Sequence, residues 1–180
     1  MAKAMTGTFT ISQTLEYSTA GNYVTASIPI GSLIDVGDAQ ALEVESVDYI
    51  WQALKTTTNE WSPIGLSFPY TGAASWGAQL MDRNAAEMLS AADNNLISSG
   101  AITQDAGGVL SHSSDFYPDD FQRNAGRFVV NDEMYVVGKL NAGTVAANMK
   151  LRLSVRVRAK VVKLSTRDWM AISLETVQNE

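Results

Sequence analysis

Residues 149–164 alternate strictly between apolar and polar side chains, and this alternation limits what the chain can fold into. Every odd position from Met149 to Val161 is apolar, whereas the even positions between them hold five cations and one serine. Successive side chains of a β-strand point to opposite faces of a sheet, so a period of two predicts a strand with one buried face. At ~3.3 Å per residue such a strand spans ~45–50 Å, which is two to three times the usual length.

The polar face of this long strand is basic. Its cations are Lys150, Arg152, Arg156, Arg158 and Lys160. Seven of the thirteen Lys and Arg residues lie between positions 150 and 167, where there is no acidic residue, so the rest of the chain carries six basic and nineteen acidic side chains. This separation of charge favours head-to-tail or patch-to-patch contacts between copies. We therefore predict that the basic face contacts a partner, and a merely solvated face is the alternative.

Composition is typical of one ordinary domain. A chain of 180 residues, 46% of them hydrophobic, can bury roughly 70% of its unfolded surface, and residues 1–180 are predicted to form a single domain. The absence of cysteine excludes disulfides, zinc ribbons and thiol nucleophiles. Residues 1–9 do not resemble a signal peptide and no apolar stretch approaches ~18 residues, so we expect a soluble protein.

Strand patterns fill most of the remaining sequence. They are predicted over residues 5–17, 23–30, 41–52, 61–70, 127–130, 134–140 and 169–177. Pro29 places the second of them at a sheet edge or a strand end. In the third, the apolar phase moves from even positions at Leu42 and Val44 to odd positions at Val47, which predicts a β-bulge or a bend where the strand switches sheets. Its acidic residues Glu43, Glu45 and Asp48 are the expected counterweight to the basic strand.

One helix and one long loop interrupt these strands. Residues 76–92 carry an i, i+4 apolar stripe behind Ser75, which predicts a mid-chain helix. Residues 98–126 are rich in Gly, Ser, Asp and Asn and predict a long loop excursion. The predicted fold class is all-β: a single eight-stranded antiparallel jelly-roll sandwich or barrel with one mid-chain helix and this excursion.

The chain lacks a convincing catalytic, cofactor or metal motif. His112 has serines and Asp115 beside it, but no G-x-S-x-G turn supplies a nucleophile, so we expect no enzyme. Three loop carboxylates could hold a hard cation, although no D-x-D-x-D-G loop is present; they are Asp115, Asp119 and Asp120. We expect no metal there, and a contact anchored by neighbouring aromatic residues is the favoured interpretation; these are Phe116, Tyr117 and Phe121.

Binding to nucleic acid or to a small ligand is less favoured than assembly. The basic strand face has no aromatic side chain on which bases could stack, and the sequence pI is about 4.7. Four tryptophans could supply stacking platforms in a carbohydrate- or ligand-binding β-sandwich module, which is the alternative function; they are Trp51, Trp61, Trp76 and Trp169. Tryptophans dispersed through strand and helix patterns are more often part of a core.

In architecture, the chain resembles the single jelly-roll coat proteins of icosahedral viruses. The resemblance rests on size, about eight strands, the absence of cysteine, a mid-chain excursion and the long strand near the C-terminus, A-N-M-K-L-R-L-S-V-R-V-R-A-K-V-V. It is nearest to the small major capsid proteins of membrane-containing icosahedral archaeal and thermophile-infecting viruses. The resemblance implies a virion protein, assembled in the host cytoplasm, whose partners are further copies, alone or with a second capsid protein. Contact with an internal membrane or with nucleic acid stays open.

Overall fold

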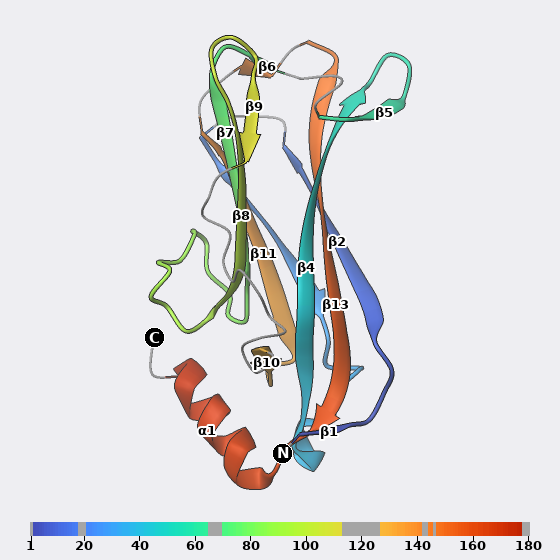
Figure 1. The fold of residues 1–180 in the computed structure, drawn as a ribbon, viewed down its shortest axis with the longest axis vertical. Coiled ribbons are helices and arrows are strands. Elements are labelled where there is room, and N and C mark those ends of the chain that lie inside the picture. The colour runs from blue at the N-terminus through green and yellow to red at the C-terminus, as the bar shows by residue number, and fades with distance from the viewer. Residues whose placement is uncertain are drawn as a thin grey trace.

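The structure is a computed structural model that describes residues 2–17, 21–64, 70–112, 127–141, 144–145 and 147–177. Two antiparallel sheets pack face to face as a sandwich, and one helix lies at the end where the chain begins (Figure 1). We call the two layers sheet A and sheet B. A third pairing joins the two-residue strands β6 (Tyr70–Thr71) and β12 (Thr144–Val145).

Sheet A is organised around the long basic strand. Its six strands are β1 (Lys3–Ala4), β2 (Phe9–Tyr17), β4 (Gln40–Lys55), β5 (Glu60–Pro63), β10 (Arg127–Val129) and β13 (Met149–Lys163). Strand β13 is hydrogen-bonded to β4 on one side and to β2 and β1 on the other. Strands β10 and β5 pair with successive parts of the far edge of β4.

Sheet B has the order β3-β11-β7-β8-β9. Its strands are β3 (Tyr23–Pro29), β7 (Ala74–Met81), β8 (Leu96–Gln104), β9 (Leu110–His112) and β11 (Glu133–Asn141). Strand β3 lies at one edge of the sheet and Pro29 is its last residue, as predicted from the missing N–H donor of proline.

The strand order is that of a jelly roll. Eight principal strands form the layers β2-β13-β4-β10 and β3-β11-β7-β8. Along the chain, consecutive members of this set alternate between the two sheets, except at the β7–β8 hairpin. This alternation is how two Greek keys wrap into a double-sheet sandwich. The predicted all-β, eight-stranded jelly-roll class is confirmed.

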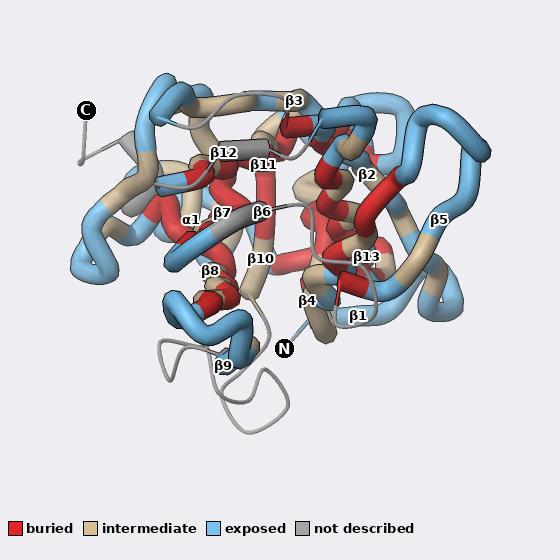
Figure 2. Tube along the Cα trace, turned by 90° about the horizontal axis from the view of Figure 1, so that it is seen from above, coloured by how far each residue is buried: buried red, intermediate tan, exposed pale blue. Residues whose placement is uncertain are grey.

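Strand β13 is the strand that the alternation predicted. It runs beside β4 along most of the long axis of the molecule (Figure 1). The odd-numbered side chains from Leu151 to Ala159 are fully buried, and Arg156 and Arg158 between them are exposed. Seen along the long axis, the buried segments lie where the two layers face each other (Figure 2). The apolar face of β13 is therefore a central part of the core.

The phase slip of β4 is a β-bulge. Arg158 of β13 lies opposite Ser46, whereas the next residue, Ala159, lies opposite Val44. Glu45 is therefore the extra residue on β4, and the bulge prediction is confirmed. The bulge keeps Val44 and Val47 on the core side although they differ in phase.

The mid-chain helix predicted over residues 76–92 is wrong. Residues up to Met81 belong to β7, which pairs with β11 on one side and β8 on the other, and residues 82–95 follow as an irregular segment. Trp76 and Leu80 fit an i, i+4 stripe, but with Ala78 they also fit a period of two, and all three side chains are buried. Pairing on both sides decides in favour of the strand, because local propensity yields to tertiary context.

The helix of this fold is α1 (Thr166–Val177), so the strand predicted over residues 169–177 is also wrong. Ser165 precedes the helix, and its Oγ accepts a hydrogen bond of 3.1 Å from the backbone N–H of Asp168. Trp169 and Ile172, three positions apart, pack against a small cluster at this end of the sandwich. The cluster consists of Ala41, Val130, Val162 and Leu164.

The excursion predicted over residues 98–126 is wrong in its first part. Residues up to Gln104 lie in β8, and Leu110 begins β9. Small residues such as Gly100 obscure the apolar alternation of β8 in the sequence. A Cβ at Gly100 would come within 2.8 Å of the Tyr49 ring, so glycine lets sheets A and B approach closely here. Residues 113–126 lie outside the described residues, and with them lie the predicted anchors and loop carboxylates. These are Phe116, Tyr117, Phe121, Asp115, Asp119 and Asp120.

Candidate interaction surface

The outer face of sheet A carries the even-numbered side chains of β13. Cross-strand register sets their neighbours: Arg156 lies between Ser12 of β2 and Asp48 of β4. Arg158 lies between Thr10 and Ser46 in the same way. At the centre of this face, two guanidinium groups are thus flanked by short polar side chains.

At the end of this face near β5, two cations are paired within the chain. Glu16 of β2 accepts a hydrogen bond of 2.6 Å from Arg152, and Lys150 lies 3.5 Å from its other oxygen. The hydrogen bond from Arg152 is the main cause that holds the pKa of Glu16 below its ordinary value. The Arg152 guanidinium also lies over the Trp61 ring, 4.2 Å from its centroid.

At the opposite end, Lys160 is held by two carboxylates of β4. Its Nζ lies 3.3 Å from Glu43 and 3.2 Å from Glu45, the bulge residue. These contacts, led by the hydrogen bond to Glu45, raise the pKa of Lys160. Burial acts to raise the pKa of Glu45, but the hydrogen bonds from Lys160 and Thr8 outweigh it and the pKa lies below the ordinary value. The predicted acidic counterweight is confirmed for Glu43 and Glu45.

Arg156 and Arg158 differ from the other cations of this strand. Within the described part of the chain neither of them forms an ion pair, and Asp48 does not approach Arg156 within 4.0 Å. Of the five cations predicted as a contact surface, Lys150, Arg152 and Lys160 are therefore engaged within the chain and two are available. We call Arg156 and Arg158 the free arginine pair. Glu16 was missed because only the β2–β13 register brings it to this face.

A depression lies where β7 ends and β11 begins, on the other sheet. It has a volume of about 480 Å³. Its lining residues are Asp82, Arg83, Asn84, Asn131, Asp132, Glu133 and Tyr135. The turn at Asp132 is fixed because its carbonyl oxygen accepts hydrogen bonds from Ile30 and Gly31. Sequence patterns gave no sign of this depression, because its residues come from separate turns.

Asp82 is the buried acid of this depression. Its side chain is 0% exposed, and Arg127 binds its Oδ2 at 3.0 Å. Burial raises the pKa of Asp82 to about 6, although the positive charge of Arg127 opposes this shift. Its Oδ1 is buried and has no hydrogen-bond partner among the described residues.

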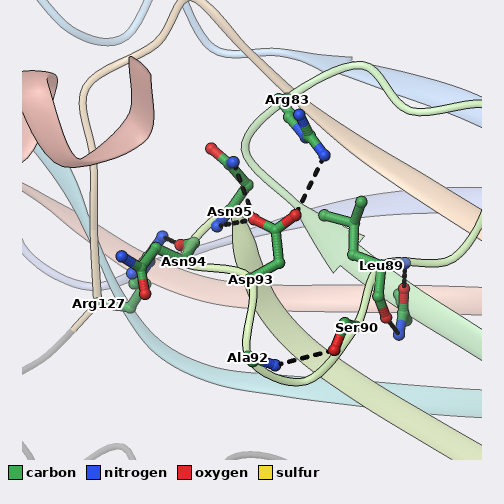
Figure 3. A network of polar contacts seen from close by, with 9 residues as sticks. Arg83, Leu89, Ser90, Ala92, Asp93, Asn94, Asn95 and Arg127 are labelled. Atoms are coloured by element: carbon green, nitrogen blue, oxygen red, sulfur yellow. Dashed lines mark hydrogen bonds and ion pairs between the residues drawn. The ribbon is translucent and has the colours of Figure 1, made fainter. Parts of the chain in front are cut away.

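The segment 82–95 is tied across the outer side of β7. The Gln79 side chain accepts from the N–H of Leu89 at 2.7 Å and donates to its carbonyl at 3.0 Å. Arg83 pairs with Asp93 at 3.1 Å, and Arg127 donates to the Asn94 carbonyl (Figure 3). A Cβ at Gly77 would lie 3.0 Å from the end of Met88, so glycine makes room for the segment. These bonds hold one wall of the depression in place.

The tryptophans do not form an exposed platform. Trp51 and Trp76 lie in the core with ring centroids 6.0 Å apart, and Trp169, a residue of α1, packs against the small cluster at the end of the sandwich. Trp61 is 38% exposed, and Arg152 lies over its ring. This arrangement favours the structural interpretation of the tryptophans over a ligand-binding one.

Across the described ranges, no three His, Cys, Asp or Glu side chains come together in a way that could hold a metal ion. Nor does any helix in that part of the chain have the length and apolarity needed to cross a membrane. His112 ends β9, at an edge of sheet B.

Comparison with known proteins yields distant structural neighbours. No family model matches the chain, and no curated protein sequence matches it. VP1 of Trichodysplasia spinulosa-associated polyomavirus, solved with GM1 oligosaccharide, is similar at 11% identity and a TM-score of 0.46, covering 90% of this chain and 97% of that chain. The structure of Turnip Yellow Mosaic Virus is similar at 9% identity and a TM-score of 0.30, covering 91% of this chain and 99% of that chain. The nora virus structure is similar at 8% identity and a TM-score of 0.33, covering 88% of this chain and 57% of that chain. Scores this low carry no argument, and the fold follows from the strand order above.

Proposed function

We propose that this chain is a structural subunit of a viral capsid, in which residues 1–180 act as one jelly-roll domain. Copies assemble into a closed shell around the viral genome or an internal membrane, and the protein works by binding rather than by catalysis. Its partners are further copies, alone or with a second coat protein, and its location is the virion after assembly in the host cytoplasm. The observation that carries the proposal is the free arginine pair on the exposed outer face of sheet A.

The free arginine pair lacks an ion-pair partner among the described residues of the isolated chain. Arg156 and Arg158 are two positions apart on one strand, so their side chains leave the same face and their like charges repel. The other three cations of this basic face, Lys150, Arg152 and Lys160, have carboxylates placed for them by β2 and β4. A contact that brings negative groups to this face relieves the repulsion, which favours association.

Helix α1 supports the same proposal independently. Trp169 and Ile172 face the end of the sandwich, yet Met170 and Leu174, one turn apart, are 56% and 63% exposed. A helix that is apolar on two sides is typically buried on both. The outward side of α1 is thus a second surface suited to a neighbouring subunit.

A carbohydrate- or ligand-binding module is less well supported. Ligand sites are usually concave and mainly apolar, and they bury most of the ligand. Two depressions among the described residues, at Asp82 and at Ala74, are open and lined by polar or small side chains. The tryptophans lie in the core, between α1 and the end of the sandwich, or beneath Arg152. No observation favours a second function strongly enough to propose it.

Measuring the mass of the purified protein tests the proposal. We expect light scattering at low ionic strength to report megadalton particles, and negative-stain electron microscopy to show closed shells. An R156S/R158S variant should keep its fold and assemble at higher protein concentration only. A wild-type protein that stays at 19.4 kDa at every concentration and salt would overturn the proposal.

A further inference from the structure

The two unbalanced charged surfaces lie on opposite layers of the sandwich. The free arginine pair is on the outer face of sheet A. In sheet B, Tyr135 of the depression alternates with the buried Met134 and Val136, so it points away from the core. The hydrophobic core separates the two surfaces, and a single copy cannot bring them together (Figure 2).

The depression has two carboxylates in excess. Arg83 is balanced by Asp93, and Asp82 is balanced by Arg127. Asp132 and Glu133 form no ion pair with any residue that the structure describes, although Glu133 accepts a hydrogen bond from Tyr135. Among the described residues, two carboxylates without an ion pair on one surface therefore match two guanidinium groups without an ion pair on the other.

Asp82 gives an independent indication that a donor belongs in this depression. Its carboxylate is buried and its Oδ1 has no hydrogen-bond partner among the described residues, an arrangement that costs free energy in a folded protein. The depression holds about 480 Å³, which is the space of more than ten waters at ~30 Å³ each. That space admits the head of an arginine side chain.

The surroundings of the free arginine pair favour a carboxylate partner over nucleic acid. Asp48 lies opposite Arg156 in the same row, and a polyphosphate running along the strand would meet this negative charge. Hydroxyl side chains flank the pair at Thr10 and Ser12, with no aromatic ring on which a base could stack.

We infer that the free arginine pair of one copy docks into the depression at Asp132 and Glu133 of a second copy. The inference rests on the proposed function, because it names the contact through which copies assemble. Guanidinium and carboxylate groups form short, bidentate, charge-assisted hydrogen bonds, so the contact is oriented as well as attractive. It joins different surfaces of the two copies head to tail, and such contacts produce rings when the rotation closes.

Two variants, each blocking one surface, test this contact. R156S/R158S removes the cations, and D132N/E133Q removes the carboxylates with little change of shape. We expect each variant alone to need at least tenfold more protein for half-assembly than the wild type. An equimolar mixture should form a complex of twice the chain mass and stop there, because each complex has one intact pair of surfaces. Analytical ultracentrifugation measures these species directly.

A matched control is K150S/R152S, which removes two cations of the same strand that Glu16 already pairs. It should assemble like the wild type, and circular dichroism should show that every variant is folded. Normal assembly of D132N/E133Q overturns the inference while the proposed function stands. A 20-nucleotide DNA that binds the wild type but not R156S/R158S also overturns it, in favour of nucleic acid. A wild type that never assembles overturns the proposed function itself.

Discussion

The hydroxyl group of Tyr17 lies against Gly138, in the middle of the sandwich. Tyr17 belongs to β2 of sheet A, and Gly138 belongs to β11 of sheet B. A Cβ at position 138 would collide with the tyrosine hydroxyl and come within 3.3 Å of Leu15. Glycine is thus required at this position because a large side chain of the opposite sheet occupies the space.

We predict that Gly138→Ala destabilises the fold. Overpacking of a closely packed core costs ~1–3 kcal/mol, and here the obstacle is the rigid ring of Tyr17. Urea denaturation followed by tryptophan fluorescence measures the free energy of unfolding. Gly7→Ala is the control, since a Cβ there meets no atom within 4 Å and should change stability by less than ~0.5 kcal/mol. Equal stability of both variants would contradict the packing described at Tyr17.

Much of the fold was predictable because apolar and polar residues alternate clearly along its long strands. Strand β13 and the bulge at Glu45 follow from the phase of apolar residues alone. Around Trp76 and again around Trp169, apolar residues satisfy the periods of a strand and of a helix together. The segment around Trp76 forms strand β7 because it pairs with its neighbours in the sheet. The segment around Trp169 forms helix α1, which is capped by Ser165.

For the candidate surface, the sequence predicts the basic strand but not which side chains of the neighbouring strands lie beside its cations. The alternation identifies five cations, but which of them are free depends on the neighbours that register provides. Glu16 is more than a hundred residues away in sequence from Arg152 and binds it at 2.6 Å. The depression at Asp132 depends in the same way on two stretches of chain, residues 82–84 and 131–135, that lie far apart in the sequence.

Salt should weaken assembly. The screening length falls from ~10 Å at 0.1 M salt to ~3 Å at 1 M, so contacts between exposed arginines and carboxylates lose most of their attraction. We expect the mean particle mass from light scattering to fall over this range, and R156S/R158S to respond much less. Assembly that strengthens with salt would indicate that apolar contacts, such as those of α1, drive it instead.

The two sides of α1 should respond differently to substitution. M170S/L174S alters side chains that are mainly exposed, so we expect little change in thermal stability but weaker assembly. Ile172→Ala removes packing against the cluster at the end of the sandwich and should cost ~1–2 kcal/mol, with the monomer affected as much as the assembly. Thermal unfolding and light scattering on the same samples separate the two effects. An unfolded M170S/L174S variant would mean that its outward face is part of the core.

Finally, Asp82 should make the stability of the folded chain depend on pH. Burial raises its pKa from the ordinary value of 3.8 to about 6, so between these values the folded state holds a proton that the unfolded state has lost. The contribution of this group to stability is fully present below pH ~4 and is lost as pH rises through about 6, by up to ~3 kcal/mol. Asp82→Asn removes the titration.

The carboxylates whose pKa is lowered, such as Glu16 and Glu45, give the opposite slope, but they are common to both proteins and cancel in the comparison. Urea denaturation at intervals from pH 4 to pH 7 gives the free energy of unfolding of each protein. We expect the wild type to lose stability relative to Asp82→Asn as pH rises through this window, because only the wild type must ionise a buried carboxylate there. Parallel curves would show that the ion pair with Arg127 offsets the burial of Asp82 completely, and that its carboxylate titrates normally.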